Sequence, residues 1–286
     1  MRGIVLKAWR FMSVLAAGGW LACAPLPLLA EAEGRPARDA AVQAGVAEAA
    51  RLGELMYLYD QAAWHATDSM VEGFDQALTP LMRGYIVVPG AAGQLDTIFY
   101  GEVDGTLVEM ARFAVRGSEV VGGGWLPANG RRPLSEEVLR LVAARQTAIN
   151  YASSQQFRLC ERTTPNTVVL PPDAQGTIAV YILTPPVAND AYPLGGHYRL
   201  EVDATGAVAR SRNFMNTCMM ARYGAGDGGE APVAMVVSHL LDDHPTEIHA
   251  FVSRYVPISL MVATIENRAM WLVEKGAIRY QEQIPE

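Results

Sequence analysis

The chain has 286 residues, of which 50% are hydrophobic and 19% charged, and its formal net charge is −7 at pH 7. An acidic balance argues against a nucleic-acid partner, because phosphate binding needs clustered lysine and arginine. It also argues against attraction to anionic lipid surfaces.

The N-terminal segment has the three parts of a secretory signal peptide. Three basic residues within the first ten positions are followed by a mainly apolar run over residues 11–30 and by the small-x-small motif Ala30-Glu31-Ala32. We expect cleavage after Ala32, which leaves a periplasmic or secreted mature chain. Because residues 1–32 carry three basic side chains and one acidic one, their removal changes the net charge to −9.

Two alternatives to cleavage remain for this segment. An uncleaved membrane anchor needs about 20 uninterrupted apolar residues, whereas Pro25, Pro27 and paired glycines interrupt the run. A lipid anchor would be attached at Cys23, but Trp20 stands where lipoprotein signals normally have a small branched aliphatic residue. No later segment is apolar and long enough to predict a transmembrane span.

Cys160 and Cys218 remain in the mature chain once the signal peptide is removed. An even cysteine count in an oxidising compartment predicts a disulfide. Closing a loop of this length stabilises a fold by about 4 kcal/mol on the chain-entropy model. A two-cysteine metal site is the alternative, although the sequence has no C-x-x-C motif to support it.

A first helix is predicted to begin after Asp39. In the segment AAVQAGVAEAARLGELMYLY apolar residues recur at spacings of three and four, which indicates an amphipathic helix. Gly45 and Gly53 each weaken such a helix by about 1 kcal/mol relative to alanine.

Residues 84–122 are predicted to form an antiparallel meander. Asp104-Gly105 is a candidate two-residue hairpin turn, because glycine tolerates the positive φ that such a turn requires. The expected strands cover residues 85–88, 97–103, 107–115 and 119–121.

A second helix is predicted to begin after Ser135 and to run to about Ala152. Ser135 is a good N-cap, and two glutamates follow it at the positive end of the helix. Beyond this helix we expect strands at residues 167–170, 177–183, 197–202, 208–214, 233–241, 247–255, 258–264 and 270–274.

The predicted order of elements indicates an α+β fold with antiparallel sheets rather than alternating βαβ units. Each of two lobes, residues 33–130 and 131–286, would consist of a helix and a meander, with the C-terminal half mostly β and one disulfide. The polar stretch 129–133 is the expected boundary, and one continuous domain is the alternative.

Residues 224–229 match G-x-G-x-x-G, but the context does not favour a nucleotide site. The dinucleotide motif needs a preceding strand and a following helix N-terminus, whereas an apolar β-like run follows here. We interpret the segment as a flexible surface loop.

The segment from His239 to His249 is the most concentrated set of chemically active residues, with three of the five histidines and three carboxylates. If residues 241 and 247 pair across a five-residue loop, His239 lies opposite His249 and diagonal to Glu247, with the histidine Cβ atoms about 5 Å apart. His239, Glu247 and His249 are therefore the candidate catalytic residues and the candidate ligands of a divalent metal, which is the single cofactor that the sequence suggests.

The register of this hairpin decides the interpretation. A four-residue loop sends the two histidines to opposite faces of the sheet. In the structural interpretation, which we prefer, residues 242–245 form a polar turn with His244 exposed, and His239 and His249 are hydrogen-bonded residues at the edge of a buried face.

Two weaker candidate sites remain. His65 and Asp68 could touch at i and i+3 if the first helix continues, but the preferred interpretation is a helix end with Trp64 as a core anchor. The second is a strand stripe that we interpret as a solvated sheet face or, alternatively, an anion site, formed by His197, Arg199, Glu201, Arg210 and Arg212.

Three function classes are compatible with these patterns. We expect a non-catalytic exported binding or accessory protein that holds a small molecule or an envelope protein on a sheet face or in a groove. The alternatives are a metal-assisted or acid–base hydrolase using His239, Glu247 and His249, and a secreted inhibitor or structural protein with exposed Trp125 or Trp271 as its anchors.

Overall fold

The computed structural model describes residues 39–225 and 229–285. The expected signal peptide (residues 1–32), the cleavage site after Ala32 and Cys23 lie outside these residues, as does part of the predicted glycine-rich loop. Within the described ranges, no helix is both long and apolar enough to cross a membrane.

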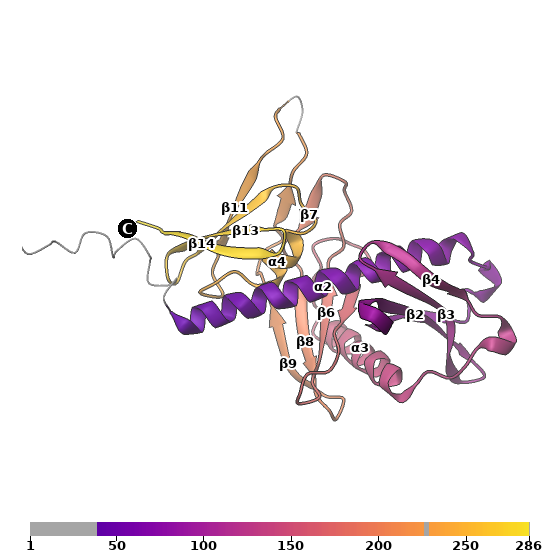
Figure 1. Cartoon of the computed structure of the whole chain (residues 1–286). Coiled ribbons are helices and arrows are strands. Elements are labelled where there is room, and N and C mark those ends of the chain that lie inside the picture. Colours follow the sequence, from indigo (N-terminus) through magenta and orange to yellow (C-terminus); the bar gives the residue numbers. More distant parts are fainter. Residues whose placement is uncertain (1–38, 226–228, 286) are drawn as a thin grey trace, which may run out of the picture. The chain divides into compact units, whose positions relative to one another are not determined.

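The first helix, α2 (Ala40–Glu72), extends well beyond the predicted segment (Figure 1). The Asp39 side chain caps it by accepting hydrogen bonds from the backbone N–H groups of Ala41 and Val42, at 2.8 and 3.3 Å. Its apolar stripe is buried, including Val42, Val46, Ala49, Met56 and Ala63. The helix contacts strands of the first sheet and also β5 (Asn166–Val169), β14 (Ala277–Gln283) and α4 (Glu247–Val252).

The predicted meander forms the first sheet, in which β1 (Met82–Pro89), β2 (Leu95–Val103), β3 (Thr106–Arg116) and β4 (Glu119–Trp125) pair antiparallel in sequence order. Its strands alternate between two hydrophobic clusters, because successive side chains point to opposite faces. Phe99 and Phe113 join the cluster that contains α2 residues, whereas Ile86 and Ile98 join the cluster that contains residues of the second helix, α3 (Glu136–Ser154).

Helix α3 (Glu136–Ser154) begins where the sequence predicts, with the Ser135 hydroxyl accepting a hydrogen bond from the N–H of Val138. It contacts β1 and the second antiparallel sheet. That sheet has the order β5-β6-β8-β9, formed by β5 (Asn166–Val169), β6 (Ile178–Leu183), β8 (Tyr198–Val202) and β9 (Val208–Asn213). A short separate pair joins β7 (Ala191–Pro193) to β10 (Met220–Arg222).

The predicted strand at residues 247–255 is wrong, because this segment contains helix α4 (Glu247–Val252). In the third sheet β11 (Ala234–His239) pairs parallel with β12 (Ser259–Thr264), and a parallel pair requires a crossover connection rather than a hairpin. Helix α4 lies in that crossover. The sheet continues antiparallel through β13 (Ala269–Glu274) and β14 (Ala277–Gln283).

The fold class is α+β, with mostly antiparallel sheets and one disulfide between Cys160 and Cys218. One hydrophobic cluster includes Val46 and Phe99 together with Tyr181 and Trp271, so it contains residues from both predicted lobes. The boundary at residues 129–133 stays a prediction.

Candidate functional site

A cleft of about 750 Å³ lies beside the second half of α2. This volume falls within the range of small-molecule sites, about 300–1,000 Å³. Helix α2 contributes Asp60 and Trp64, one turn apart on the same side of the helix. Four tyrosines from other elements complete its aromatic lining: Tyr85, Tyr192, Tyr223 and Tyr255.

The aromatic wall of the cleft is held by ring packing. Tyr192 and Tyr255 stack with their ring centroids 4.9 Å apart and their planes 19° from parallel. Phe251 of α4 contacts both rings edge-on, at centroid distances of 6.2 and 5.2 Å. Since such contacts fix ring orientation, the wall is formed before any ligand arrives.

Asp60 is the one acidic residue among the described residues that line the cleft. The Tyr255 hydroxyl donates a 2.6 Å hydrogen bond to Asp60 Oδ2 and accepts one of 3.1 Å from the Gln61 amide. Burial raises the pKa of the Asp60 carboxyl, an effect that the hydrogen bond from Tyr255 opposes. Burial first, and then the charge of Asp60, raise the pKa values of the Tyr85, Tyr192 and Tyr255 hydroxyls.

Trp64 is 54% exposed at the cleft rather than a core anchor, so that part of the prediction is wrong. Helix α2 continues past it, and the Trp64 ring stacks on His65 with a centroid distance of 5.5 Å. Asp68 is exposed on the same helix. In the part of the chain that the structure describes, no hydrogen bond or ion pair joins His65 to Asp68, and His65 Nε2 is a buried atom without a hydrogen-bond partner.

His239 and His249 do lie together, although no hairpin joins them. Their ring centroids are 4.9 Å apart at 84°. His239, at the end of β11, forms a 2.7 Å hydrogen bond through Nε2 to Asp242 Oδ2. His249, in the first turn of α4, accepts a 3.1 Å hydrogen bond at Nδ1 from the backbone N–H of Thr246 and so helps to cap the helix.

Glu247 binds a different set of side chains from the two histidines. Its carboxylate accepts hydrogen bonds from Arg199 Nη1 at 2.6 Å and from the Tyr181 hydroxyl at 3.3 Å. Over residues 39–225 and 229–285, no three His, Cys, Asp or Glu side chains are placed so that they could hold a metal ion.

The protonation of the buried histidines favours a structural role. Burial lowers the pKa of His249 to about 3, and the neighbouring His239 adds to this shift. Burial also lowers the pKa of His197 to about 4. A general base works best with a pKa near the operating pH, so a histidine with a pKa of about 3 is a poor proton acceptor at neutral pH.

The strand stripe around His197 is a solvated face only in part, because Arg210 is exposed whereas the other members are partly or fully buried. His197 is fully buried, while Arg199 is bound to Glu247 and Arg212 to Asp242. The carboxylates that neutralise these arginines come from the crossover segment around α4, which the predicted hairpin would have placed elsewhere. Both guanidinium groups therefore already have anionic partners within the fold.

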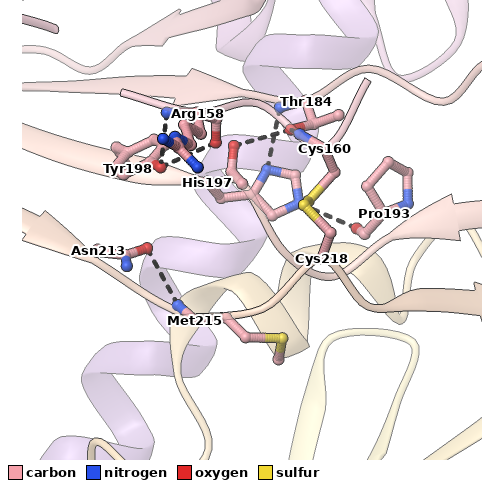
Figure 2. The surroundings of a disulfide bond; sticks show 10 residues. Arg158, Cys160, Thr184, Pro193, His197, Tyr198, Asn213, Met215 and Cys218 are labelled. Carbon is pink, nitrogen blue, oxygen red and sulfur yellow. Dashed lines mark hydrogen bonds between the residues drawn. A yellow bond between two sulfur atoms is a disulfide. The ribbon is translucent and has the colours of Figure 1, made fainter. Parts of the chain in front are cut away.

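The disulfide joins the segment after α3 to the segment before β10 (Figure 2). The Cα atoms of Cys160 and Cys218 are 5.2 Å apart, and the Cys160 N–H donates a 3.1 Å hydrogen bond to Thr184 Oγ1. His197 lies beside it, accepting a hydrogen bond from the Thr184 N–H and donating one to the Pro193 carbonyl.

The two tryptophans considered as docking anchors differ in exposure. Trp271 is 1% exposed and its indole N–H donates a hydrogen bond to Thr264 Oγ1, so the expectation that it is a surface anchor is wrong. Trp125 is partly buried, and its indole N–H donates to the Met70 carbonyl.

The cleft was missed at the level of sequence because its lining is spread from residue 60 to residue 255. One signal was present. Asp60 lies between Met56 and Ala63 on the apolar stripe of α2. A carboxylate is unusual at such a position and indicates a specific structural or functional role.

Comparison with protein-family models gives no match for this chain, and comparison with curated proteins gives none either.

Proposed function

We propose that this chain is an exported binding protein that holds a small organic molecule in the cleft beside α2. The observation that carries the proposal is the cleft itself, which combines a volume of about 750 Å³ with an aromatic lining and one carboxylate. Ligand sites are typically lined by apolar and aromatic side chains with a few placed polar groups.

The chemistry of the lining supports binding rather than turnover. Asp60 and the tyrosine hydroxyls offer hydrogen bonding, and the rings offer stacking surfaces. Covalent catalysis needs a nucleophile next to a base that activates it. The raised pKa values of Tyr85, Tyr192 and Tyr255 keep these hydroxyls protonated at neutral pH, as hydrogen-bond donors.

Export is the second part of the proposal. It rests on the signal-like pattern of residues 1–32 and on the disulfide between Cys160 and Cys218. Structural disulfides are typical of the periplasm and of secreted proteins, because cytosolic thiols are kept reduced.

The experiment is to purify the exported chain and to identify bound small molecules by native mass spectrometry. Trp64→Ala removes an exposed ring from the cleft without opening the core, and we expect it to lower ligand occupancy by about 10-fold, the loss of one stacking contact. Val71→Ala is the matched control, since Val71 is 61% exposed on the same helix and does not line the cleft.

Two results would contradict the proposal. One is equal occupancy in wild type and Trp64→Ala, which would place the ligand elsewhere. The other is a wild-type protein that carries no small molecule and binds none of the small molecules titrated by calorimetry.

A further inference from the structure

We infer that the ligand of the cleft is an organic cation, an amine or quaternary ammonium compound whose charge meets Asp60 and whose alkyl groups lie against the tyrosine rings. The inference rests on the proposed function and names its ligand class. It is carried by a carboxylate and an aromatic wall that line the same cleft, with no basic residue among the described lining residues.

The charges around the cleft favour a cationic ligand. Asp60 lines the cleft, and no Lys, Arg or His is among the described residues that line it. Two arginines near lining residues have other partners: Arg145, whose charge acts on Tyr85, donates from Nε to Thr167 Oγ1 at 2.8 Å, and Arg254 lies over the Tyr57 ring at 4.2 Å. Asp60 is partly buried and forms no ion pair among the described residues. A partly desolvated carboxylate without a cationic partner is costly, so a cationic ligand would supply the missing charge.

The aromatic wall of the cleft also favours a cationic ligand. The stacked pair Tyr192 and Tyr255 lies next to the carboxylate, since Tyr255 is hydrogen-bonded to it. Ring faces carry negative potential and attract cations within about 6 Å, most strongly where water is excluded. Rings and a carboxylate in one pocket are the combination that recognises an ammonium group together with its hydrocarbon substituents.

The two carboxyl oxygens of Asp60 are held differently by the protein. Tyr255 fixes Oδ2, and Gln61 fixes the Tyr255 hydroxyl in turn. Within the described residues no hydrogen bond reaches the second oxygen, Oδ1. One oxygen is therefore anchored by the protein while the other is left for a ligand donor, and this geometry disfavours an anionic ligand.

The experiment compares ligands of similar size and shape that differ in charge. Isothermal titration calorimetry on the purified mature chain would use choline against its neutral carbon isostere 3,3-dimethyl-1-butanol, and benzylamine against benzyl alcohol and benzoate. We expect at least one cation to bind about 10-fold or more tightly than its neutral partner, and benzoate not to bind.

Asp60→Asn tests the role of the carboxylate while keeping an oxygen that can accept the hydrogen bond from Tyr255. We expect this variant to lose about 10-fold or more in cation affinity and to keep its affinity for the neutral isostere. Asp68→Asn, on the exposed side of the same helix, is the matched control and should bind as wild type does. If Asp60→Asn unfolds, Trp64→Ala gives the second test, because Trp64 is exposed and its loss should weaken cations more than alcohols.

The outcomes separate the two proposals. Neutral isosteres that bind as tightly as the cations, or a benzoate that binds, would overturn the cation inference and leave the binding function standing. Cation affinity unchanged in both Asp60→Asn and Trp64→Ala would overturn it as well. No binding of any compound, with no co-purified ligand, would overturn both.

Discussion

At the scale of single residues, His197 and His249 are buried with imidazoles that the fold holds neutral. Burial lowers their pKa values to about 4 and about 3, below the value near 6.5 expected in an unfolded chain. The folded state therefore takes up these protons less readily than the unfolded state. Their contribution to stability is complete above about pH 6.5 and is lost as the pH falls toward 4.

We predict that the free energy of unfolding drops by up to about 1.4 kcal/mol per pH unit for each of these histidines below pH 6.5. Urea unfolding at pH 7, 6, 5 and 4 measures the slope. His249→Asn keeps a side-chain acceptor near the Thr246 N–H and removes one titrating group, so its slope should be smaller. An identical slope in wild type and variant would refute the assignment.

The Asp242 carboxyl affects the free energy of unfolding in a different pH range from the two histidines, and it serves as an internal reference for them. Burial raises the pKa of its carboxyl, but the hydrogen bond from His239 and the charge of Arg212 outweigh this effect and lower it overall. A lowered carboxyl pKa costs stability as the pH falls below about 4, after most of the histidine effect has occurred.

At the scale of elements, Gly53 shows how α2 and α4 fit together. A Cβ atom at this position would lie 2.6 Å from Ala250 Cβ and 2.9 Å from the Glu247 carbonyl oxygen. The sequence alone marks Gly53 as a weak point of a helix, whereas in the structure it is a position at which the crossover helix α4 approaches α2 closely. Packing contacts between helices cannot be derived from the periodicity of one of them.

We predict that Gly53→Ala lowers the free energy of unfolding by about 1–3 kcal/mol, because overpacking against α4 outweighs the gain of about 1 kcal/mol in helix propensity. Gly122→Ala is the control, since a Cβ there meets nothing within 4 Å. Thermal and urea unfolding of both variants provide the measurement. A Gly53→Ala variant more stable than wild type would show that α4 can yield at this contact.

The sequence correctly predicted a turn and a helix cap, because both depend on interactions between residues that are close in the chain. The β2–β3 turn at Asp104-Gly105 has φ values of 49° and 76°, as a two-residue hairpin requires, and Ser135 caps α3 as expected. The prediction of a strand at residues 247–255 was wrong because a short buried run of apolar residues has no period that separates helix from strand. The chain forms a helix here because β11 and β12 pair parallel and need a crossover connection. That pairing is a property of the sheet and not of the segment.

At the scale of the whole molecule, the cleft joins residues that are far apart in the chain. Asp60 and Tyr255 are hydrogen-bonded across a sequence separation of 195. The sequence predicted α+β composition and the cysteine pair, yet it could not place these two side chains together, because their contact depends on how α2, β7 and α4 pack. His239 and His249 also lie together for a non-local reason, because a crossover helix stands in place of the expected turn.

The disulfide connects this tertiary arrangement to the cleft. Cys218 lies two residues before the start of β10, and β10 pairs with β7 so that Ala221 lies opposite Tyr192. At the other end of the bond, Cys160 is hydrogen-bonded to Thr184, which directly precedes the cleft loop at residues 185–189. The bond therefore holds together two segments that contribute to the cleft lining.

We predict that the double variant Cys160→Ala/Cys218→Ala loses about 2–5 kcal/mol of unfolding free energy and also binds its ligand more weakly, because Tyr192 and the 185–189 loop lose a constraint. Urea unfolding and calorimetry with the best-binding amine would measure the two effects. Reductant should reproduce both losses in the wild type and have no effect on the double variant, which controls for other actions of the reagent. If reduction leaves the unfolding midpoint of the wild type unchanged, the disulfide does not stabilise the fold. If it leaves the affinity unchanged, the disulfide does not support the cleft.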